Sequence, residues 1–529
     1  MTQPVTYPPG SSPRHRIREA FSPDNLRTLA HRLADVLGEH MDHVTRCEGA
    51  VLNWADPPDN VRRAGAILDT ATSQNTAAAE GSDEIEPAGI QLRESLVDRF
   101  ESLVREMLQR GHNLHDPRYI GHQVPAPVPI AGLFDAVGSI TNQVMAIYEM
   151  GPWSTSVERA LVERLGQQIG WSPDSFAGLV THGGSLGNLT ALLTARNVRL
   201  GDAWETGLSG QSATPVIVAH QDAHYSVSRA AGVVGIGVDH VLRCGLDEKR
   251  RMDPNQLDEL LGQLRSKNHP IVAVSACSCA TPIGAFDPLE DIAAVCHRHE
   301  VWLHVDAAHG GAACLSRKYR HLVAGLDQAD SLVMDAHKML FVPALCAFVF
   351  YRNRDHRFET FRQDAPYLFD PSAPGLAEYD SGMLTPECTK RAATYGLWGT
   401  WALFGQQLFE DMVDQTFDLG HTFYEMLTDA PDFEPLHVPE CNIVAFRHIP
   451  DAMRGESEER LAQFLFELRR ELIHSGEFYI VQANVGGLQA LRVTIINPLT
   501  TADHLAGLLE AIRRIGRQLL TADKSARES

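Results

Sequence analysis

The segment of residues 301–352 constrains the fold of this chain more than any other part of its sequence. The apolar run 301–305 ends at Asp306, and a second apolar run, 331–334, leads through an Asp-Ala-His triplet to Lys338. Short apolar runs of this kind predict buried strands, and strands that alternate with helices form a mostly parallel sheet. Because ligands bind such sheets at the carboxyl ends of the strands, Asp306 and Lys338 are expected at one common rim.

An acid and a lysine at one rim are the two groups that pyridoxal phosphate requires of a protein. This cofactor is attached to a lysine amine as a Schiff base, and a carboxylate keeps its pyridine nitrogen protonated so that the ring can take up electrons. Lys338 and Asp306 suit these two tasks. A purely structural interpretation also exists, because any pair of buried strands can end in Asp and Lys. The neighbouring residues decide between the two.

Those neighbours resemble the group II pyridoxal-phosphate decarboxylases, the family of glutamate, diaminobutyrate and aromatic amino-acid decarboxylases. The likeness rests on four short sequence motifs, which are His304-Val-Asp-Ala-Ala308, Gly310-Gly311, Ala329-Asp-Ser331 and His337-Lys338. The resemblance implies an α/β fold of type I, like that of aspartate aminotransferase, with pyridoxal 5′-phosphate as cofactor. It also implies that Lys338 is the Schiff-base lysine, that Asp306 holds the pyridinium proton, and that Ala308 packs under the ring.

Composition restricts the location and the partners of the chain. The 529 residues carry a formal net charge of −21, which argues against binding to nucleic acid or to an anionic membrane. No secretory signal and no membrane-spanning run is visible, so a cytoplasmic location is expected. The nine cysteines are an odd number and are expected to be reduced thiols. Cys277 and Cys279 could suggest a metal pair, but no second pair accompanies them, and no metal is expected.

Three parts of the chain differ in pattern. An N-terminal arm with dimerisation helices (1–114) precedes a large cofactor-binding domain (115–399) and a small C-terminal α/β domain (400–529). Within the first part, Ser22 before Pro23 predicts the start of a helix, residues 72–87 are expected to be a linker, and 90–110 are amphipathic. In the resembled family, such N-terminal helices wrap the partner subunit of a homodimer. Packing on their own domain is the alternative.

A glycine-rich motif at residues 181–188 predicts a phosphate-binding turn between a strand and a helix. Glycines permit a tight turn with exposed amides, and the following helix offers its positive end to an anion. A glycine turn alone is weak support, since many such turns need one. The segment also matches the Gly-Gly-Thr-x-Ser-Asn type of motif in the resembled family, so phosphate binding is assigned to Gly184 and Ser185. Asn188 matches as well, although it could simply hold the turn.

Two further sequence motifs resemble those that contact the cofactor in the same family. His224, just beyond a predicted strand, is expected to stack on the pyridine ring. The alternative is a metal pair with His220, but four-residue spacing has no special meaning at a strand end. Thr281 is expected to contact the cofactor. Asp287 is expected to order its loop and to cap the helix 289–299.

Around the lysine, the sequence departs from the family pattern. His337 is expected to reach the phosphate. Asp335 stands where the animal-type members usually have asparagine, and a carboxylate there would be repelled by phosphate unless a cation or a proton intervened. Some bacterial members share this aspartate. Arg492 interrupts an apolar strand and matches the arginine that binds the α-carboxylate of the substrate, a task that suits a guanidinium group.

Three residues are candidates for selecting the substrate side chain. His122, Asn142 and Tyr148 resemble the segment that lines the substrate pocket of decarboxylases, partly across the dimer interface. His122 replaces a glutamine common in glutamate decarboxylases, which puts a glutamate substrate in doubt. A loop at 364–380 is expected to supply a tyrosine that protonates the reacting carbon, with Tyr367 as first candidate and Tyr379 as second. The Cys-x-Arg motif of the family is replaced here by Cys388-Thr-Lys390.

The predicted function is therefore decarboxylation of an L-amino acid to the amine and carbon dioxide. Two alternatives stay open. Oxygen could intercept the reaction and give an aldehyde if the loop tyrosine is misplaced, or the chain could bind the cofactor without turnover, as the departures at His122, Asp335 and Lys390 would allow. Acidic, basic and aromatic substrates cannot be separated from the residues alone.

Overall fold

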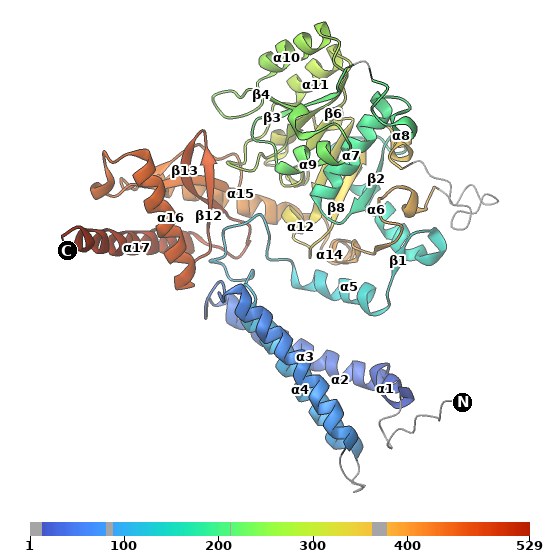
Figure 1. Cartoon of the computed structure of the whole chain (residues 1–529), viewed down its shortest axis with the longest axis vertical. Coiled ribbons are helices and arrows are strands. Elements are labelled where there is room, and N and C mark those ends of the chain that lie inside the picture. The colour runs from blue at the N-terminus through green and yellow to red at the C-terminus, as the bar shows by residue number, and fades with distance from the viewer. Residues whose placement is uncertain (1–12, 81–87, 212, 362–377, 529) are drawn as a thin grey trace. The chain divides into compact units, whose positions relative to one another are not determined.

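The computed structural model describes residues 13–80, 88–211, 213–361 and 378–528, and the chain divides into two compact units (Figure 1). The first unit consists of Met1–Tyr119 with Arg470–Tyr479, and the second consists of Ile120–Arg469 with Ile480–Ser529. The domain boundaries expected after residues 114 and 399 remain predictions.

The first unit is helical, with α1 (Pro13–Ala20), α2 (Pro23–Thr45), α3 (Pro57–Glu80) and α4 (Ala88–Arg110). The predicted start of α2 is confirmed, because Ser22 is the N-cap and its hydroxyl accepts a hydrogen bond from the Asn25 amide. The expected linker at 72–87 is wrong for its first part, since α3 continues to Glu80. An alanine-rich run has high helix propensity even where it has little to bury.

The second unit is built on a seven-stranded sheet of order β2-β8-β7-β6-β5-β3-β4. Only β8 runs in the direction opposite to the other six strands of this sheet, so the predicted mostly parallel α/β sheet is confirmed. Nearly all residues of these strands are buried, because helices cover both faces. The strands are β2 (Ala177–Thr181), β3 (Val216–His220), β4 (Val241–Cys244), β5 (Ile271–Cys277), β6 (Leu303–Asp306), β7 (Ser331–Asp335) and β8 (Ala347–Tyr351).

Two apolar layers enclose this sheet. Residues of α7 (Gly184–Arg199) and α9 (Tyr225–Val233) pack against one face. Residues of α6 (Pro152–Ile169), α10 (Pro254–Ser266) and α11 (Leu289–Arg298) pack against the other. The remaining short elements of this part are α5 (Pro129–Ile140), β1 (Val144–Met145), α8 (Ala203–Thr206), α12 (Ala336–Met339) and β9 (Lys390–Arg391).

The C-terminal part of the second unit carries a small antiparallel sheet of order β10-β11-β13-β12. Gly405 adopts a positive φ of 71° and ends α14 (Tyr395–Phe404), so that α15 (Gln407–Thr428) begins as a separate helix. The elements are α14 (Tyr395–Phe404), α15 (Gln407–Thr428), β10 (Phe433–Pro435), β11 (Ile443–His448), α16 (Glu458–Ser475, in this unit up to Arg469), β12 (Val481–Val485), β13 (Leu488–Thr494) and α17 (Ala502–Glu528).

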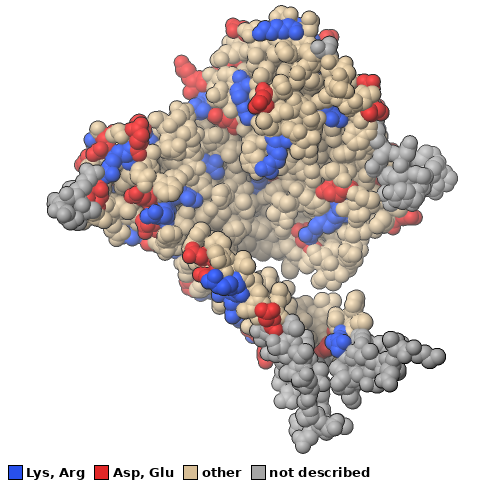
Figure 2. Space-filling model, viewed as in Figure 1, with Lys and Arg blue, Asp and Glu red and all other residues tan. Residues whose placement is uncertain are grey.

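The surface of the described residues is mixed in charge. Figure 2 shows acidic and basic side chains interspersed over the visible face of the second unit. All nine cysteines are free thiols. Within the ranges that the structure describes, no helix has both the length and the apolar character needed to cross a membrane.

Candidate active site

A cavity of about 390 Å³ lies in the second unit at the carboxyl ends of β2, β3, β5, β6 and β7. Asp306 and Lys338, predicted to meet at one rim, both line it. So does every other residue predicted to contact the cofactor. These are Gly184, Ser185, Asn188, His224, Thr281, Ala308 and His337.

Asp306 is held in place by hydrogen-bond donors on both of its oxygens. Its Oδ2 accepts a hydrogen bond from Asn188 Nδ2 at 2.8 Å, and its Oδ1 accepts one from the Ala308 amide at 3.2 Å. The Asn188 Oδ1 atom lies 3.0 Å from Nε2 of His304, which is fully buried. Burial lowers the pKa of His304 to about 4, so its ring is neutral and donates to Asn188. Asn188 therefore fixes the acid, beyond holding the turn.

Lys338 projects from α12, directly after β7. Its Nζ lies 3.2 Å from Asp335 Oδ2. Burial acts to lower the pKa of Lys338, but the carboxylates of Asp335 and Asp306 outweigh it and the pKa is raised. The amine is therefore an ammonium ion in the cofactor-free chain, and it must lose a proton before it can act as a nucleophile.

His224 is the N-cap of α9. Its Nδ1 accepts a hydrogen bond from the Ser226 amide, and its ring centroid lies 4.1 Å from that of Tyr225. Burial is the main cause that lowers the pKa of His224, although Asp306 opposes it. A neutral imidazole at the cavity wall is compatible with stacking on an aromatic ring.

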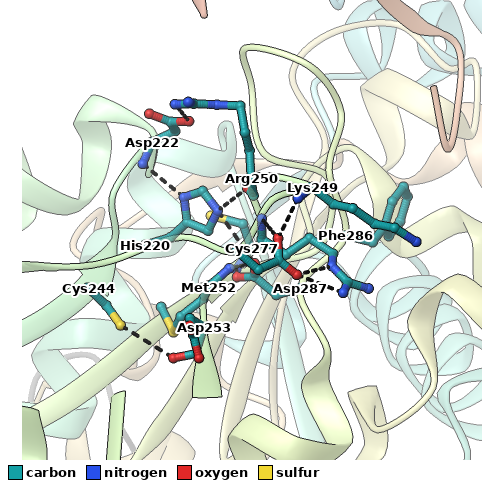
Figure 3. Close-up of polar contacts among 12 residues, drawn as sticks. His220, Asp222, Cys244, Lys249, Arg250, Met252, Asp253, Cys277, Phe286 and Asp287 are labelled. Carbon is teal, nitrogen blue, oxygen red and sulfur yellow. Dashed lines mark hydrogen bonds and ion pairs between the residues drawn. The ribbon is translucent and has the colours of Figure 1, made fainter. Parts of the chain in front are cut away.

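His220 belongs to a separate network that joins the loops after β3 and β4 (Figure 3). It is fully buried, its Nδ1 accepts from the Asp222 amide at 2.9 Å, and its Nε2 lies 3.2 Å from the Arg250 carbonyl oxygen. The Arg250 guanidinium in turn pairs with the Asp222 carboxylate, with 2.6 Å between Nη2 and Oδ2. This network braces the short segment that ends at His224.

Asp287 orders its loop as predicted, but it does not cap a helix. Its two oxygens accept hydrogen bonds from the Cys277 and Met252 amides, each at 2.7 Å. The N-cap of α11 is Pro288, which makes no side-chain cap bond. The capping prediction is wrong because the carboxylate turns back to β5 and ties the loop to it.

The glycine turn leads into the N-terminus of α7, as predicted. Gly183 is the N-cap with a φ of 103°. A Cβ at Gly184 would lie 2.8 Å from both carboxylate oxygens of Asp335, so a side chain at this position would clash with that group. His337 faces the same region, with Nδ1 2.9 Å from the Cys346 carbonyl oxygen and Nε2 3.6 Å from Asp335 Oδ2.

Arg492 lies behind the cavity wall. It projects from β13 and its Nη1 donates to the Thr281 carbonyl oxygen at 2.7 Å. The side chain is buried, its Nε has no hydrogen-bond partner, and burial lowers the pKa of the guanidinium. The structure thus places Arg492 next to a cavity residue without making it part of the lining.

The other predicted substrate residues lie outside this cavity. His122 and Asn142 are exposed, and neither lines it. Gln123, the neighbour of His122, does line it. The prediction missed this glutamine because a proline-rich loop has no periodicity that tells which of two adjacent residues points inward. His309 was also missed. It lines the cavity, is buried, and has its pKa lowered to about 3 by that burial.

The loop residues divide between described and undescribed parts of the chain. Tyr367 lies outside the described residues. Tyr379 is 38% exposed, its ring centroid is 5.7 Å from that of Tyr148, and neither ring lines the cavity. Lys390, the departure from the family arginine, is buried with its Nζ at 2.7 and 2.9 Å from the Glu158 carboxylate oxygens and 2.8 Å from the Val180 carbonyl oxygen. It is therefore a fully paired structural cation.

The sheet and the cavity together define a class. A mostly parallel sheet that brings a lysine, a carboxylate, a histidine and a glycine turn to the carboxyl ends of its strands has the architecture of a fold-type-I pyridoxal-phosphate enzyme. Comparisons with known proteins agree with this class. The profile of the pyridoxal-dependent decarboxylase conserved domain matches residues 93–449.

Curated relatives and solved structures define the family. Cysteine sulfinic acid decarboxylase of Homo sapiens is 30% identical over 435 residues, covering 81% of this chain and 87% of the relative. An acidic amino acid decarboxylase of Mus musculus is 31% identical over 385 residues, covering 72% of this chain and 70% of the relative. The crystal structure of mouse CSAD in apo form superposes with a TM-score of 0.79 at 27% identity, covering 92% of this chain and 99% of that one. The chain belongs to the pyridoxal-dependent decarboxylase family. It is an amino-acid carboxy-lyase whose cofactor is pyridoxal phosphate.

Proposed function

We propose that this enzyme converts an L-amino acid to the corresponding amine and carbon dioxide, with Lys338 as the Schiff-base lysine. The observation that carries the proposal is the convergence of Lys338, Asp306 and His224 on one cavity, with both oxygens of Asp306 occupied by donors. Pyridoxal phosphate, when bound, accepts into its ring the electron pair that remains on the substrate α-carbon after carbon dioxide leaves.

The residues of the cavity fit this cofactor. The turn at Gly184 offers backbone amides at the N-terminus of a 16-residue helix, which suits a phosphate group. Ala308 contributes a small side chain to the wall, which leaves room for a planar ring. Asp306 is oriented by Asn188 and by the Ala308 amide, so its negative charge is available to hold a proton on a ring nitrogen.

The chain's own groups have distinct tasks in this proposal. Asp306 holds the ring proton, and its orientation costs no reorganisation during the reaction because Asn188 has already fixed it. Lys338 provides the attaching amine and, once displaced by the substrate amine, can move a proton at the α-carbon. Arg492 stands behind Thr281 and supports the α-carboxylate end of the substrate site. Tyr367 remains the candidate loop acid.

Acidic amino acids are the substrate class that we propose first. Two relatives at about 30% identity carry cysteine sulfinic acid or acidic amino acids in their names. The substitution of glutamine by His122, which put glutamate in doubt, has less weight now that Gln123 is the residue that lines the cavity. Its amide can donate hydrogen bonds to an acidic side chain.

A homodimer completes the proposal. On the second unit, α5 packs against α14, and both leave large apolar side chains in solvent: Leu133 is 65%, Ile140 61% and Leu403 60% exposed. Exposed large apolar side chains on two helices that pack together fit an interface between copies. Asn142, just beyond α5, would then serve the partner's cavity. Light scattering is expected to give the mass of two chains, reduced by Ile140→Glu and unchanged by Leu499→Glu, whose exposed leucine lies elsewhere; a wild-type monomer would contradict the dimer.

The decisive experiment follows products. The purified enzyme, supplied with pyridoxal phosphate, is incubated with acidic, basic and aromatic L-amino acids in turn, and carbon dioxide, amine, aldehyde and peroxide are measured together. We expect equal amounts of amine and carbon dioxide from one substrate class. Aldehyde and peroxide in place of amine would establish the oxidative alternative. Bound cofactor without any turnover across the panel would contradict a catalytic role.

A further inference from the structure

Asp335 is a buried carboxylate at the place where the cavity offers its phosphate cradle. The residue is 3% exposed, and both of its carboxylate oxygens lie against Gly184 at the N-terminus of α7. Oδ2 is 3.2 Å from the Lys338 ammonium, while Oδ1 is buried without any hydrogen-bond partner. A buried oxygen with no donor is costly, and it marks a group whose partner arrives with the ligand.

The charges around Asp335 do not supply a permanent counter-ion. On its own segment, it faces Lys338 and the His337 ring, whose Nε2 is 3.6 Å away. From β6 and from the loop after β3 come Asp306 and His224, and burial lowers the pKa of the latter, which leaves it neutral. From the turn before α7 comes His182, and before β8 lies the thiol of Cys346, whose pKa burial raises.

Lys338 is the strongest of these partners, and it is only conditionally available. It can neutralise Asp335 while it is a free ammonium. In the proposed function, on which this inference rests, the same amine is needed for attachment to the cofactor, so it cannot remain a full counter-charge. A dianionic phosphate placed at Gly184 would then meet an uncompensated carboxylate, and two anions at close range cannot both stay fully ionised.

We propose that Asp335 and the cofactor phosphate share one proton, so that phosphate binding is coupled to proton uptake, and that Asp335 pairs with Lys338 when the cradle holds no phosphate. The shared proton gives Oδ1 or Oδ2 a hydrogen bond to a phosphate oxygen and removes the repulsion. An asparagine at this position would donate through its amide and would need no proton. Asp335 is thus a positioning residue that links cofactor affinity to pH.

The sign of the coupling follows from the proton count. Above about pH 7 the phosphate is a dianion in solution, since its second pKa is about 6, and an Asp335 carboxylate must gain a proton on binding. Affinity for a phosphorylated ligand therefore falls as pH rises, by up to about tenfold per pH unit for one proton taken up. The Asp335→Asn variant lacks this component, so its affinity is less dependent on pH and greater at the alkaline end.

The test uses pyridoxal 5′-phosphate, whose aldehyde takes Lys338 out of its pair with Asp335, and unphosphorylated pyridoxal, which reacts with the same amine, as its control. Dissociation constants of the full-length apo protein are measured between about pH 7 and about pH 9, and proton uptake is measured by calorimetry in buffers of different ionisation enthalpy. We expect wild type to take up close to one proton more than Asp335→Asn with the phosphorylated ligand and the same number with pyridoxal. Glu387→Gln removes another carboxylate near the cavity, the partner of His182 at 3.1 Å, and is expected to behave as wild type.

Equal proton uptake by wild type and Asp335→Asn would overturn the proposal, as would a difference of the same size with pyridoxal. If in addition the enzyme attaches pyridoxal phosphate and releases carbon dioxide, only the proton link has failed. A phosphate group that adds nothing to affinity in any variant would overturn both the link and the cradle assigned in the proposed function.

Discussion

Replacing Lys338 with alanine is expected to lower kcat by about 1,000-fold or more, because it removes both the attaching amine and a group that can transfer a proton at the α-carbon. The visible absorption of covalently held cofactor should disappear, and dialysis should remove the cofactor that remains. The fold should survive with a lowered unfolding midpoint, since the apolar core stays intact but the buried Asp335 carboxylate loses its partner. Activity, absorption and the unfolding midpoint of the apo protein are the three measurements.

A matched control separates the site from a general effect of losing a lysine. Lys318 is an exposed lysine that pairs with Asp418 on the surface, and Lys318→Ala is expected to leave activity and absorption unchanged. Retention of covalent cofactor by Lys338→Ala would assign the attachment to another amine. Lys390 is the next lysine to examine in that case, although its ammonium is enclosed by Glu158 and the Val180 carbonyl oxygen.

The rim of the sheet could be predicted because its signals are local. Each functional motif follows an apolar run, and in a parallel sheet all such strands end at one edge. Asp306 and Lys338 therefore had to meet once both strands were recognised. The same logic placed Gly184, His224 and Thr281 along this edge. The role of each side chain at this edge depends on contacts that are not local in sequence. Asn188 was predicted to contact the cofactor, with holding the turn as the alternative, yet its amide holds Asp306, which lies 118 residues further along the chain.

Contacts between distant segments account for the other differences. Asp287 had the sequence position of a helix cap, but amides of β5 and of the loop after β4 bind both of its oxygens. Lys390 read as a loss of the family arginine, whereas Glu158 on α6 pairs with it in the interior. Gln123 and His122 are adjacent in an irregular loop, where no period shows which one faces inward. For Asp287 and Lys390, a partner on another segment of the chain decided the outcome.

Replacing Asp306 with asparagine is expected to lower kcat by about 100- to 1,000-fold, the scale found when a preorganised polar group is removed from an active site. Cofactor attachment should persist, because Lys338 is unchanged, and KM should change little, because Asp306 faces the cofactor. The amide cannot hold the ring proton as an anion does, so electron withdrawal by the ring weakens while binding remains. Steady-state kinetics and the absorption spectrum of the loaded enzyme measure the two effects separately.

Asn188→Ala provides the graded comparison for this prediction. It leaves the Asp306 carboxylate in place with the Ala308 amide on Oδ1, but removes the donor to Oδ2, and one hydrogen bond to a charged group corresponds to about a tenfold loss in kcat. The order of activities should therefore be wild type, Asn188→Ala, then Asp306→Asn. If Asp306→Asn retained full kcat, the charge at the end of β6 would be structural, and the electron sink would need another source of its proton. If Asn188→Ala lost as much as Asp306→Asn, the orientation of the carboxylate would matter as much as its charge.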